Sequence, residues 1–542
     1  MKSIYLLLIL LFFKASFCNA QQNFKIKWQK TYGGSKTEVA NRIEQTSDSG
    51  FIVCGYTASK DKQVSGYHGG DDAWVIRTTK RGKLIWQKAL GGSDYDEITS
   101  IKPLATGGYI ACGYSISNDG DIHENHGSWD AWLCKLDFEG NIIWSKTYGG
   151  SSIDIAYGIV NTNDGGYTFA GSTSSVDGDV TGNNGEDDIW IVKVDSSGNI
   201  QWQRCYGGTF SEVGYSIQTA FSNGYIISGV TASLDGDVLD HHNTSNNYTD
   251  EWVLRIDSSG KLLWENALGG ANEDVAYDAE PTLDGGFIVA GFSNSIGGDI
   301  GNNKGEKDAW ITKLDSVGNL QWQKNLGGSK DDKGNSVKQV RDGGYIVAIS
   351  TYSDDGQVND LHGKDDIWVV KLNNRGTIEQ SITLGGSDYE EATCIQQTFD
   401  GGFVVCGGTT SSDGDVTKNR GQDDFWVVRL EPSVIDSNVL VENKMIFSAG
   451  KTLSNTESFL SISPTITTGT FQLNLQTTNT NTDQATIQVF NSIGQLVLSK
   501  QVVVNDGMLN MAITLDAAVP KGIYFIRLKT GNQQYSGKVV YQ

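Results

Sequence analysis

The sequence predicts an all-β protein, in which a seven-bladed β-propeller closed by its N-terminal strand is followed by a small C-terminal β-sandwich. A Gly-Gly dipeptide, usually followed by Ser, recurs seven times at intervals of 58 residues, with one interval of 62. Between these dipeptides, short runs of β-branched and aromatic residues alternate with Asp-Gly and Ser-Gly turn signals. The composition agrees, because 66 glycines and only 5 prolines among 542 residues suit many short strands joined by tight turns.

Each repeat is expected to contain four strands. In the third repeat these are residues 155–161, 166–173, 188–194 and 199–206, with a long loop at residues 174–187 between the second and third strands. The period exceeds the roughly 40–45 residues of common propeller blades, and the excess lies in this loop. The recurring dipeptides begin at Gly33, Gly91, Gly149, Gly207, Gly269, Gly327 and Gly385.

The two ends of the repeat predict that the propeller closes. The repeat begins with a lone fourth strand, residues 24–32, whereas the last unit runs from Leu430 into Glu431 and Pro432 without a fourth strand. Pairing the N-terminal strand with the seventh unit would remove both open sheet edges, which are sites of aggregation. An open solenoid is the structural alternative.

The first twenty residues are typical of a signal peptide. Lys2 precedes an apolar run at residues 4–13, and small residues end the segment before Gln21. No later segment approaches the roughly 20 apolar residues that a membrane helix needs, so we expect no transmembrane segment. The formal net charge of −22 disfavours nucleic acid and anionic membrane surfaces as partners.

Tryptophan and cysteine occur at fixed places in the repeat. Trp occupies the third strand of all seven units and the fourth strand of six, and Trp129 fits neither series. Six cysteines follow the signal peptide, so disulfides are an alternative in an exported chain. Cys54, Cys112 and Cys406, however, fall at one position that holds Ala or Ser in the other units, which favours buried free thiols.

The predicted propeller covers residues 21–431. It is followed by a linker at 432–457 and a non-repeating domain at 458–542. Four pieces of this domain resemble the type A sorting domain of type IX secretion in Bacteroidota-type bacteria. They are ISPTITTGTFQLNL at 462–475, IQVFNSIGQLVLSKQV at 487–502, KGIYFIRLKTG at 521–531 and GKVVYQ at 537–542. The chain departs from the family at Thr465-Ile466, where Asn-Pro is usual. A generic accessory sandwich is the alternative interpretation.

The resemblance implies a route and a partner. The protein would be exported through the periplasm, engage the type IX secretion machinery, lose the domain itself, and be released or attached to the outer cell surface. The sorting-signal residues that match the family are Pro464, Gly469, Gly494, Gly522, Tyr524 and Lys538.

Two series of carboxylates recur in all seven units, one shortly after Gly-Gly and one just before the third strand. Such regularity favours a structural role, because Asp and Glu side chains accept backbone N–H bonds in turns. A functional acidic ring is the alternative. The first series is Glu38, Asp96, Asp154, Glu212, Asp274, Asp332 and Glu390, and the second is Asp72, Asp130, Asp188, Asp250, Asp308, Asp366 and Asp424.

The long loops also carry Asp-Gly-Asp motifs, whose oxygens are ligands of the kind that Ca²⁺ prefers. The spacing is not that of an EF-hand, and solvated turns are the alternative. No cofactor is required by the sequence. The candidate calcium ligands are Asp177, Asp179, Asp413 and Asp415.

Residues that break the sevenfold repeat are the better guide to a ligand, since a specific ligand rarely has sevenfold symmetry. All six histidines lie in the long loops, where a zinc site is one interpretation. Aromatic rings in the same loops would stack on sugars, or would merely cover the blades. The candidate ligand-binding residues are Tyr67, His68, His126, Trp129, His241 and His242.

These patterns favour an exported, non-catalytic binding protein that presents one propeller face to a polysaccharide or another surface ligand, such as a surface protein. No nucleophile or metalloprotease motif and no phosphate-binding loop is present, and no catalytic residue is nominated. A secreted glycan-cleaving hydrolase is the alternative, because that chemistry needs only two suitably spaced carboxylates. A structural spacer or adhesion unit is a third interpretation.

Overall fold

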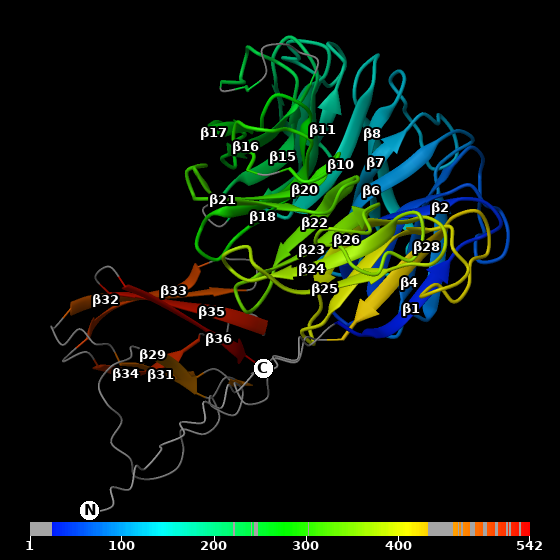
Figure 1. Ribbon diagram of the computed structural model, residues 1–542. Coiled ribbons are helices and arrows are strands. Elements are labelled where there is room, and N and C mark those ends of the chain that lie inside the picture. Colours follow the sequence, from blue (N-terminus) through cyan, green and yellow to red (C-terminus); the bar gives the residue numbers. More distant parts are fainter. Residues whose placement is uncertain are drawn as a thin grey trace, which may run out of the picture. The chain divides into compact units, whose positions relative to one another are not determined.

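The computed structural model describes residues 24–431, except 221–222, 240, 243–247 and 302, and most strands of residues 459–541 (Figure 1). The chain divides into two compact units, Met1–Val434 and Ile435–Gln542. The described residues of both units form strands and turns, without helices. The predicted signal peptide, residues 1–20, and the predicted linker, residues 432–457, lie outside the described residues.

The described strands of the first unit form seven four-stranded antiparallel sheets. The first strands of the sheets are β2 (Glu38–Gln45), β6 (Asp96–Pro103), β10 (Asp154–Asn161), β14 (Glu212–Thr219), β18 (Asp274–Pro281), β22 (Asp332–Gln339) and β26 (Glu390–Gln397). The second strands are β3 (Phe51–Thr57), β7 (Tyr109–Ser115), β11 (Tyr167–Thr173), β15 (Tyr225–Thr231), β19 (Phe287–Ser293), β23 (Tyr345–Thr351) and β27 (Phe403–Thr409).

The third and fourth strands complete the sheets. The third strands are β4 (Asp72–Thr78), β8 (Asp130–Leu136), β12 (Asp188–Val194), β16 (Asp250–Ile256), β20 (Asp308–Leu314), β24 (Asp366–Leu372) and β28 (Asp424–Leu430). The fourth strands are β5 (Leu84–Leu90), β9 (Ile142–Tyr148), β13 (Ile200–Tyr206), β17 (Leu262–Leu268), β21 (Leu320–Leu326), β25 (Ile378–Leu384) and, in the last sheet, β1 (Ile26–Tyr32).

Burial follows the order of the strands within each sheet. The second and third strands are buried almost throughout, which explains their continuous apolar sequence, whereas the fourth strands are half exposed. The third-strand tryptophans are at most 1% exposed, as in Trp190, whose indole N–H donates to Gln203 Oε1 at 2.9 Å. The six described cysteines are in the reduced form in the structure, and all but Cys205 are buried.

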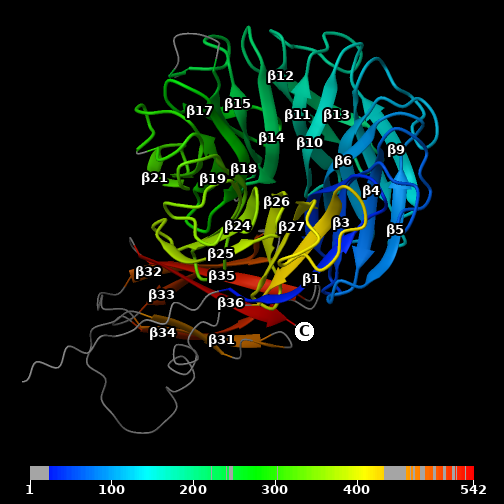
Figure 2. The same ribbon diagram turned by 45° about the vertical axis from the view of Figure 1, so that its right-hand side comes forward.

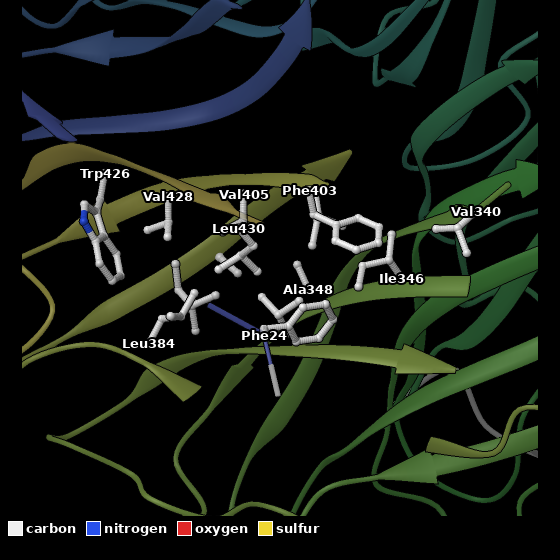
Figure 3. Packing of buried hydrophobic residues seen from close by; sticks show 14 of the residues in the cluster. Phe24, Val340, Ile346, Ala348, Leu384, Phe403, Val405, Trp426, Val428 and Leu430 are labelled. Carbon is white, nitrogen blue, oxygen red and sulfur yellow. The ribbon is translucent and has the colours of Figure 1, made fainter. Parts of the chain in front are cut away.

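The N-terminal strand belongs to the same sheet as the end of the repeat. β1 pairs antiparallel with β28, with Thr31 opposite Trp426, and β28 continues to β27 and β26. Beside this pairing, the ring of Phe24 meets that of Phe403 edge to face, with centroids 5.7 Å apart, in a cluster that includes Val405 and Leu430 (Figure 3). Burying these apolar side chains stabilises the last sheet, in which β1 and β28 come from opposite ends of the repeat.

The first strands lie around the middle of this unit (Figure 2). Each contacts the first strand of the next sheet, and β2 also contacts β26. Along each first strand the first and third residues are buried, while the second and fourth are mostly half-buried or exposed. We call these second and fourth residues the axial positions.

The second unit contains a three-stranded and a five-stranded sheet. The smaller sheet has β29 (Phe459–Ser463), β31 (Thr470–Gln476) and β34 (Met508–Thr514); the larger has β30 (Ile466–Thr467), β36 (Gln533–Tyr541), β35 (Gly522–Thr530), β32 (Asp483–Asn491) and β33 (Leu496–Val504). Both sheets contribute to one hydrophobic core, with Leu473 and Ile513 from the first and Ile487 and Ile526 from the second. This is the packing of a β-sandwich.

Candidate functional site

The loops that precede the first strands and the long loops that precede the third strands are joined by backbone hydrogen bonds. The N–H of Asp154 donates to the carbonyl of Trp129 at 2.6 Å, and the N–H of Glu212 donates to that of Asp187 at 2.7 Å. Both kinds of loop therefore gather on one side of the unit, which we call the loop face.

The first carboxylate series anchors these loops from inside. Glu212 is 0% exposed and accepts the Gly208 N–H at 2.8 Å, the Thr231 hydroxyl at 2.8 Å and the Ser233 N–H at 3.1 Å. The acid of this series accepts the N–H of the second glycine in every sheet, as in Asp154 with Gly150 at 2.8 Å. These bonds supply the structural role that the regular spacing favours.

The second series faces the first across each junction between neighbouring sheets. A β-carbon added to Gly207 would lie 2.4 Å from both Asp188 Oδ1 and Glu212 Oε2. Only glycine therefore fits between the two carboxylates at this junction. Asp188 Oδ2 accepts the Asn184 N–H at 3.0 Å, whereas its Oδ1 has no hydrogen-bond partner within the described chain. The corresponding oxygen is also buried and unpartnered in Asp130, Asp308, Asp366 and Asp424.

Burial of paired carboxyl groups raises the pKa of acids at several junctions. Burial, together with the charge of Glu212, raises the pKa of Asp188 to about 7. Burial likewise raises the pKa of Asp130 to about 6, with Asp154 as the neighbouring charge, and that of Asp332 to about 6, with Asp308 as the neighbour. The junctions are therefore sites where protons stabilise the fold.

Four of the six histidines occupy one repeated position, each in a different sheet. His68, His126 and His362 each donate their backbone N–H to the third-strand Asp four residues later, at 2.8 Å, and Nδ1 lies 2.6 to 2.9 Å from the same carboxylate. Asn184 and Lys304 occupy this position in other sheets. His242 resembles them, with its N–H 2.7 Å from Asp250 Oδ2.

The Asp-Gly-Asp motifs join the two kinds of loop. Asp177 Oδ1 accepts the Ser151 N–H at 2.7 Å, and Asp413 Oδ1 accepts the Ser387 N–H at 2.8 Å. Asp179 and Asp415 accept the N–H of the first glycine at 3.4 and 3.3 Å. No group of three or more His, Cys, Asp or Glu side chains within the described residues is arranged to hold a metal ion. Calcium binding here stays a prediction.

The axial positions differ from sheet to sheet and divide into two sectors. Asn or Thr stands at the fourth position in four sheets, but Tyr157, Tyr215 and Tyr277 occupy it on the neighbouring strands β10, β14 and β18. Their rings lie 5.4 and 5.3 Å apart, and Phe292 extends the series 5.9 Å from Tyr277. We call these four residues the aromatic sector.

The loops of the same three sheets expose apolar side chains. Val176, Leu234 and Ile296 are 74%, 45% and 79% exposed. The residues at the same place in the other four sheets are Lys60, Asn118, Asp354 and Ser412. Three neighbouring sheets thus combine an exposed aliphatic side chain at this place in the loop with an axial tyrosine.

Carboxylates occupy the other side of the axis. We call Asp71, Glu97, Glu391 and Asp423 the acidic sector, because burial and then the charges of these four residues raise the pKa of the Tyr56 phenol to about 12. Burial also raises the pKa of the Glu97 and Glu391 carboxyl groups themselves. Asn41 Nδ2 donates to Glu97 Oε1 at 2.7 Å from the neighbouring sheet.

The predicted ligand-binding residues fall into three places. Trp129 is half-buried on the loop face, with ring centroids 5.0 Å from Tyr114 and 6.3 Å from Tyr95. The hydroxyl of Tyr67 donates to the Gly70 carbonyl at 2.6 Å, within its own loop. His241 and His242 line an open depression of about 590 Å³ with Leu239, Asn266 and Asp299.

Sequence reasoning missed both axial sectors. The pattern that reveals them is the comparison of the residues one and three places after each first-series acid across the seven repeats. At the second position, Glu97 and Glu391 differ from the other sheets, which have an aliphatic residue or Lys333. At the fourth position, three neighbouring sheets have tyrosine where the others have Asn or Thr. The comparison of loops alone directed attention to the histidines, of which His68, His126 and His362 make the same repeated contact with a third-strand Asp.

The sorting-signal residues are only partly described. Tyr524 is 2% exposed, and its ring lies 6.4 Å from that of Tyr541 in the sandwich core. Gly522 begins β35, and Lys538 lies opposite Phe525 in the β35–β36 pairing. Pro464, Gly469 and Gly494 lie outside the described residues.

Residues 462–542 match the family model of the secretion system C-terminal sorting domain. The protein is therefore exported through the type IX secretion system to the outer surface, and its sorting domain engages that machinery. No helix in the described part of the chain is long and apolar enough to cross a bilayer.

A curated relative is the regulatory protein FlaEY of Caulobacter vibrioides, 24% identical over 332 residues, which cover 55% of this chain but only 35% of that protein. Among solved structures, BBS1N in complex with ARL6DN covers 75% of this chain and 97% of its own, at 7% identity and a TM-score of 0.40. Puromycin hydrolase covers 82% of this chain and 59% of its own, at 10% identity and a TM-score of 0.43. We draw no functional argument from likenesses at this level.

Proposed function

We propose that residues 21–431 form a closed seven-bladed propeller whose loop face binds a polysaccharide or another surface ligand without cleaving it. The β1–β28 pairing and the contact of β2 with β26 support closure. The secretion signal supports a ligand outside the cell. The observation that carries the binding role is the aromatic sector, which covers three neighbouring sheets and no others.

An aromatic sector beside a carboxylate sector suits a carbohydrate. The apolar face of a sugar ring stacks on Tyr or Trp, while carboxylate and amide oxygens bond its hydroxyl groups. Of the predicted ligand-binding residues, Trp129 fits this site best, since its ring contacts Tyr114, whose hydroxyl donates to Glu97 of the acidic sector. The depression at His241 and His242 is a second place for the same ligand class.

A glycan hydrolase is the second candidate, because Glu97 and Glu391 are carboxylates outside the repeated series. Burial raises the pKa of both, which is what a general acid requires.

A polysaccharide binding and product-release screen on the full mature chain tests both candidates, with calcium and with chelator. Tyr215→Asn should weaken binding about tenfold through lost stacking, roughly 1.4 kcal/mol. Asn is the matched replacement, because Asn41 and Asn335 hold the same axial position. His362→Asn is the control outside the aromatic sector and should leave binding unchanged.

The outcomes separate the candidates. Binding without product release, weakened by Tyr215→Asn, supports the binding role. Release of reducing ends that is abolished in Glu97→Gln/Glu391→Gln supports the hydrolase instead. Loss of binding in chelator would establish calcium dependence, and no binding to any glycan would leave a structural or protein-binding role.

A further inference from the structure

Two cysteines stand directly opposite each other in the last sheet. Cys394 on β26 pairs with Cys406 on β27 in antiparallel register. Residues paired in this way have Cα atoms about 4.5–5.5 Å apart, within the roughly 4.4–6.8 Å that a disulfide spans. Both side chains are 0% exposed, and both belong to the hydrophobic cluster that joins the last sheet to the first.

The pairing is specific to this sheet. The position of Cys406 is a small-residue site, shared with Cys54, Cys112 and alanines. The opposing position on the first strand differs: Cys54 stands opposite Arg42, and Cys112 stands opposite Ser100. In the remaining sheets that position holds Gly158, Ser216, Asp278 and Ser336. Within the described repeat, only the last sheet has cysteine on both sides.

The two thiols differ in the packed sheet. The hydrogen bond with Cys406 and then the charge of Arg42 outweigh burial and lower the pKa of Cys394. Burial raises the pKa of Cys406 instead, as it does that of the Cys54, Cys112, Cys134 and Cys205 thiols. Thiolates, not thiols, attack disulfides, and before the sheets pack both cysteines ionise as ordinary exposed thiols.

We propose that Cys394 and Cys406 form an intrachain disulfide while the exported chain folds in an oxidising compartment. The Cys394 thiolate attacks the disulfide of a small-molecule oxidant or of a thiol–disulfide oxidoreductase, which forms a mixed disulfide and releases one thiol of the oxidant. The Cys406 thiolate then attacks the Cys394 sulfur and releases the second thiol. Two protons leave the cysteines, and their two electrons reduce the oxidant's S–S bond to two thiols. Because both sulfurs are buried in the finished fold, this exchange precedes final packing.

The disulfide would cross-link two strands of the sheet that contains both ends of the repeat. β26 and β27 belong to the sheet whose outer strand is the N-terminal β1, and Thr393 Oγ1 donates to the Ala40 carbonyl of the first sheet at 2.7 Å. A covalent link within this sheet would restrict the unfolded chain and so stabilise the place where closure depends on residues most distant in sequence.

The test is peptide mass analysis of the full chain, exported to an oxidising compartment and alkylated in denaturant without reductant. Cys394 and Cys406 fall in one tryptic peptide, residues 376–418. We expect that peptide to be unalkylated and two hydrogens lighter than the dithiol, and to take up two alkyl groups only after reduction. Chymotryptic cleavage between the cysteines should give two linked fragments.

Variants distinguish the effect of losing the disulfide from a general folding defect. Cys394→Ser and Cys406→Ala each place at their site a residue that other sheets already use, and Cys112→Ala is the matched control at the same strand position. A reductant should lower the thermal midpoint of the wild type and of Cys112→Ala by a few degrees, and leave Cys394→Ser unchanged. Recovery of peptide 376–418 as the dithiol, both from the exported chain and after refolding with oxidised glutathione, would overturn the proposal.

Discussion

At the junctions between neighbouring sheets the same buried acids occur in every repeat, whereas the axial side chains change from sheet to sheet. Glu212 and Asp188 meet at one such junction, and their counterparts meet at the others. Tyr215 has counterparts in only two neighbouring sheets, and Glu97 in only one sheet. The junctions carry out a task that every four-stranded sheet shares, so repetition there indicates structure. A ligand without sevenfold symmetry needs side chains that differ from sheet to sheet, so departure from the repeat indicates a binding site.

The largest expected effect comes from a buried ion pair between first strands that departs from the repeat but has a structural role. Lys338 is 9% exposed, and its Nζ lies 2.9 Å from Asp278 and 3.0 Å from Glu280 of the neighbouring strand. Lys338→Met should lower the free energy of unfolding by about 3–5 kcal/mol, because it leaves the buried Asp278 carboxylate without its cation. Urea denaturation measures this loss.

The double variant Lys338→Met/Asp278→Ser is the control. Ser100, Ser216 and Ser336 occupy the position of Asp278 in other sheets, so the double variant removes the stranded charge and should recover most of the stability. A double variant as unstable as Lys338→Met would mean that the pair does not act through charge.

Removing a junction acid should have the next largest effect. Glu212→Ala leaves the Gly208 N–H and the Thr231 hydroxyl without an acceptor, at a cost of about 2–3 kcal/mol in unfolding free energy. Exposed Glu139→Ala is the control and should change stability by less than about 0.5 kcal/mol. Equal losses in the two variants would contradict a structural role for the repeated acids.

The junction carboxyl pairs should make stability depend on pH. The pKa of Asp188 is about 7 in the fold and 3.8 without it. Its contribution is therefore complete below the lower value and is lost as the pH rises toward about 7, because ionisation is costly only in the folded state. Denaturation curves from pH 4 to 8 should show stability falling, and falling less steeply in Asp188→Asn.

Asp137→Asn provides the matching comparison for this series. Asp137 lies on an exposed turn, where hydrogen bonds from Asn141 lower its pKa, so this variant should retain the full decline of the wild type. An unchanged slope in Asp188→Asn would show that the junction pair is not the titrating element.

The smallest effect is expected at the loop histidines. His126→Asn keeps the backbone N–H that bonds Asp130, and Asn184 already holds the equivalent place in the next sheet. Stability should change by less than about 0.5 kcal/mol. Glycan binding should be measured on the same variant. A tenfold loss of affinity without a change in stability would show that His126 contacts the ligand and is more than a repeated structural residue.

Much of the first unit could be predicted from the pattern of the chain. The Gly-Gly period, the tryptophan series and the unmatched strand at residues 24–32 predict strands that the structure forms, including the pairing of β1 with β28. The repeated acids could be assigned to turns for the same reason, since each occurs at a fixed distance from a turn glycine. The candidate site could not be predicted in this way, because Tyr157, Tyr215 and Tyr277 lie one repeat apart and look like ordinary strand residues.

The sequence by itself determined the strand pattern, the repeat, the shared acids and the secretion signal, because all four depend on local spacing or on a contiguous motif. Only the tertiary structure decided which side chains meet. Packing the sheets about one axis brings three tyrosines into ring contact and places two acids at each junction. Pairing β26 with β27 sets Cys394 opposite Cys406. Burial then sets the charge of these groups, since the desolvation that raises the pKa of Asp188 exists only after the sheets have packed.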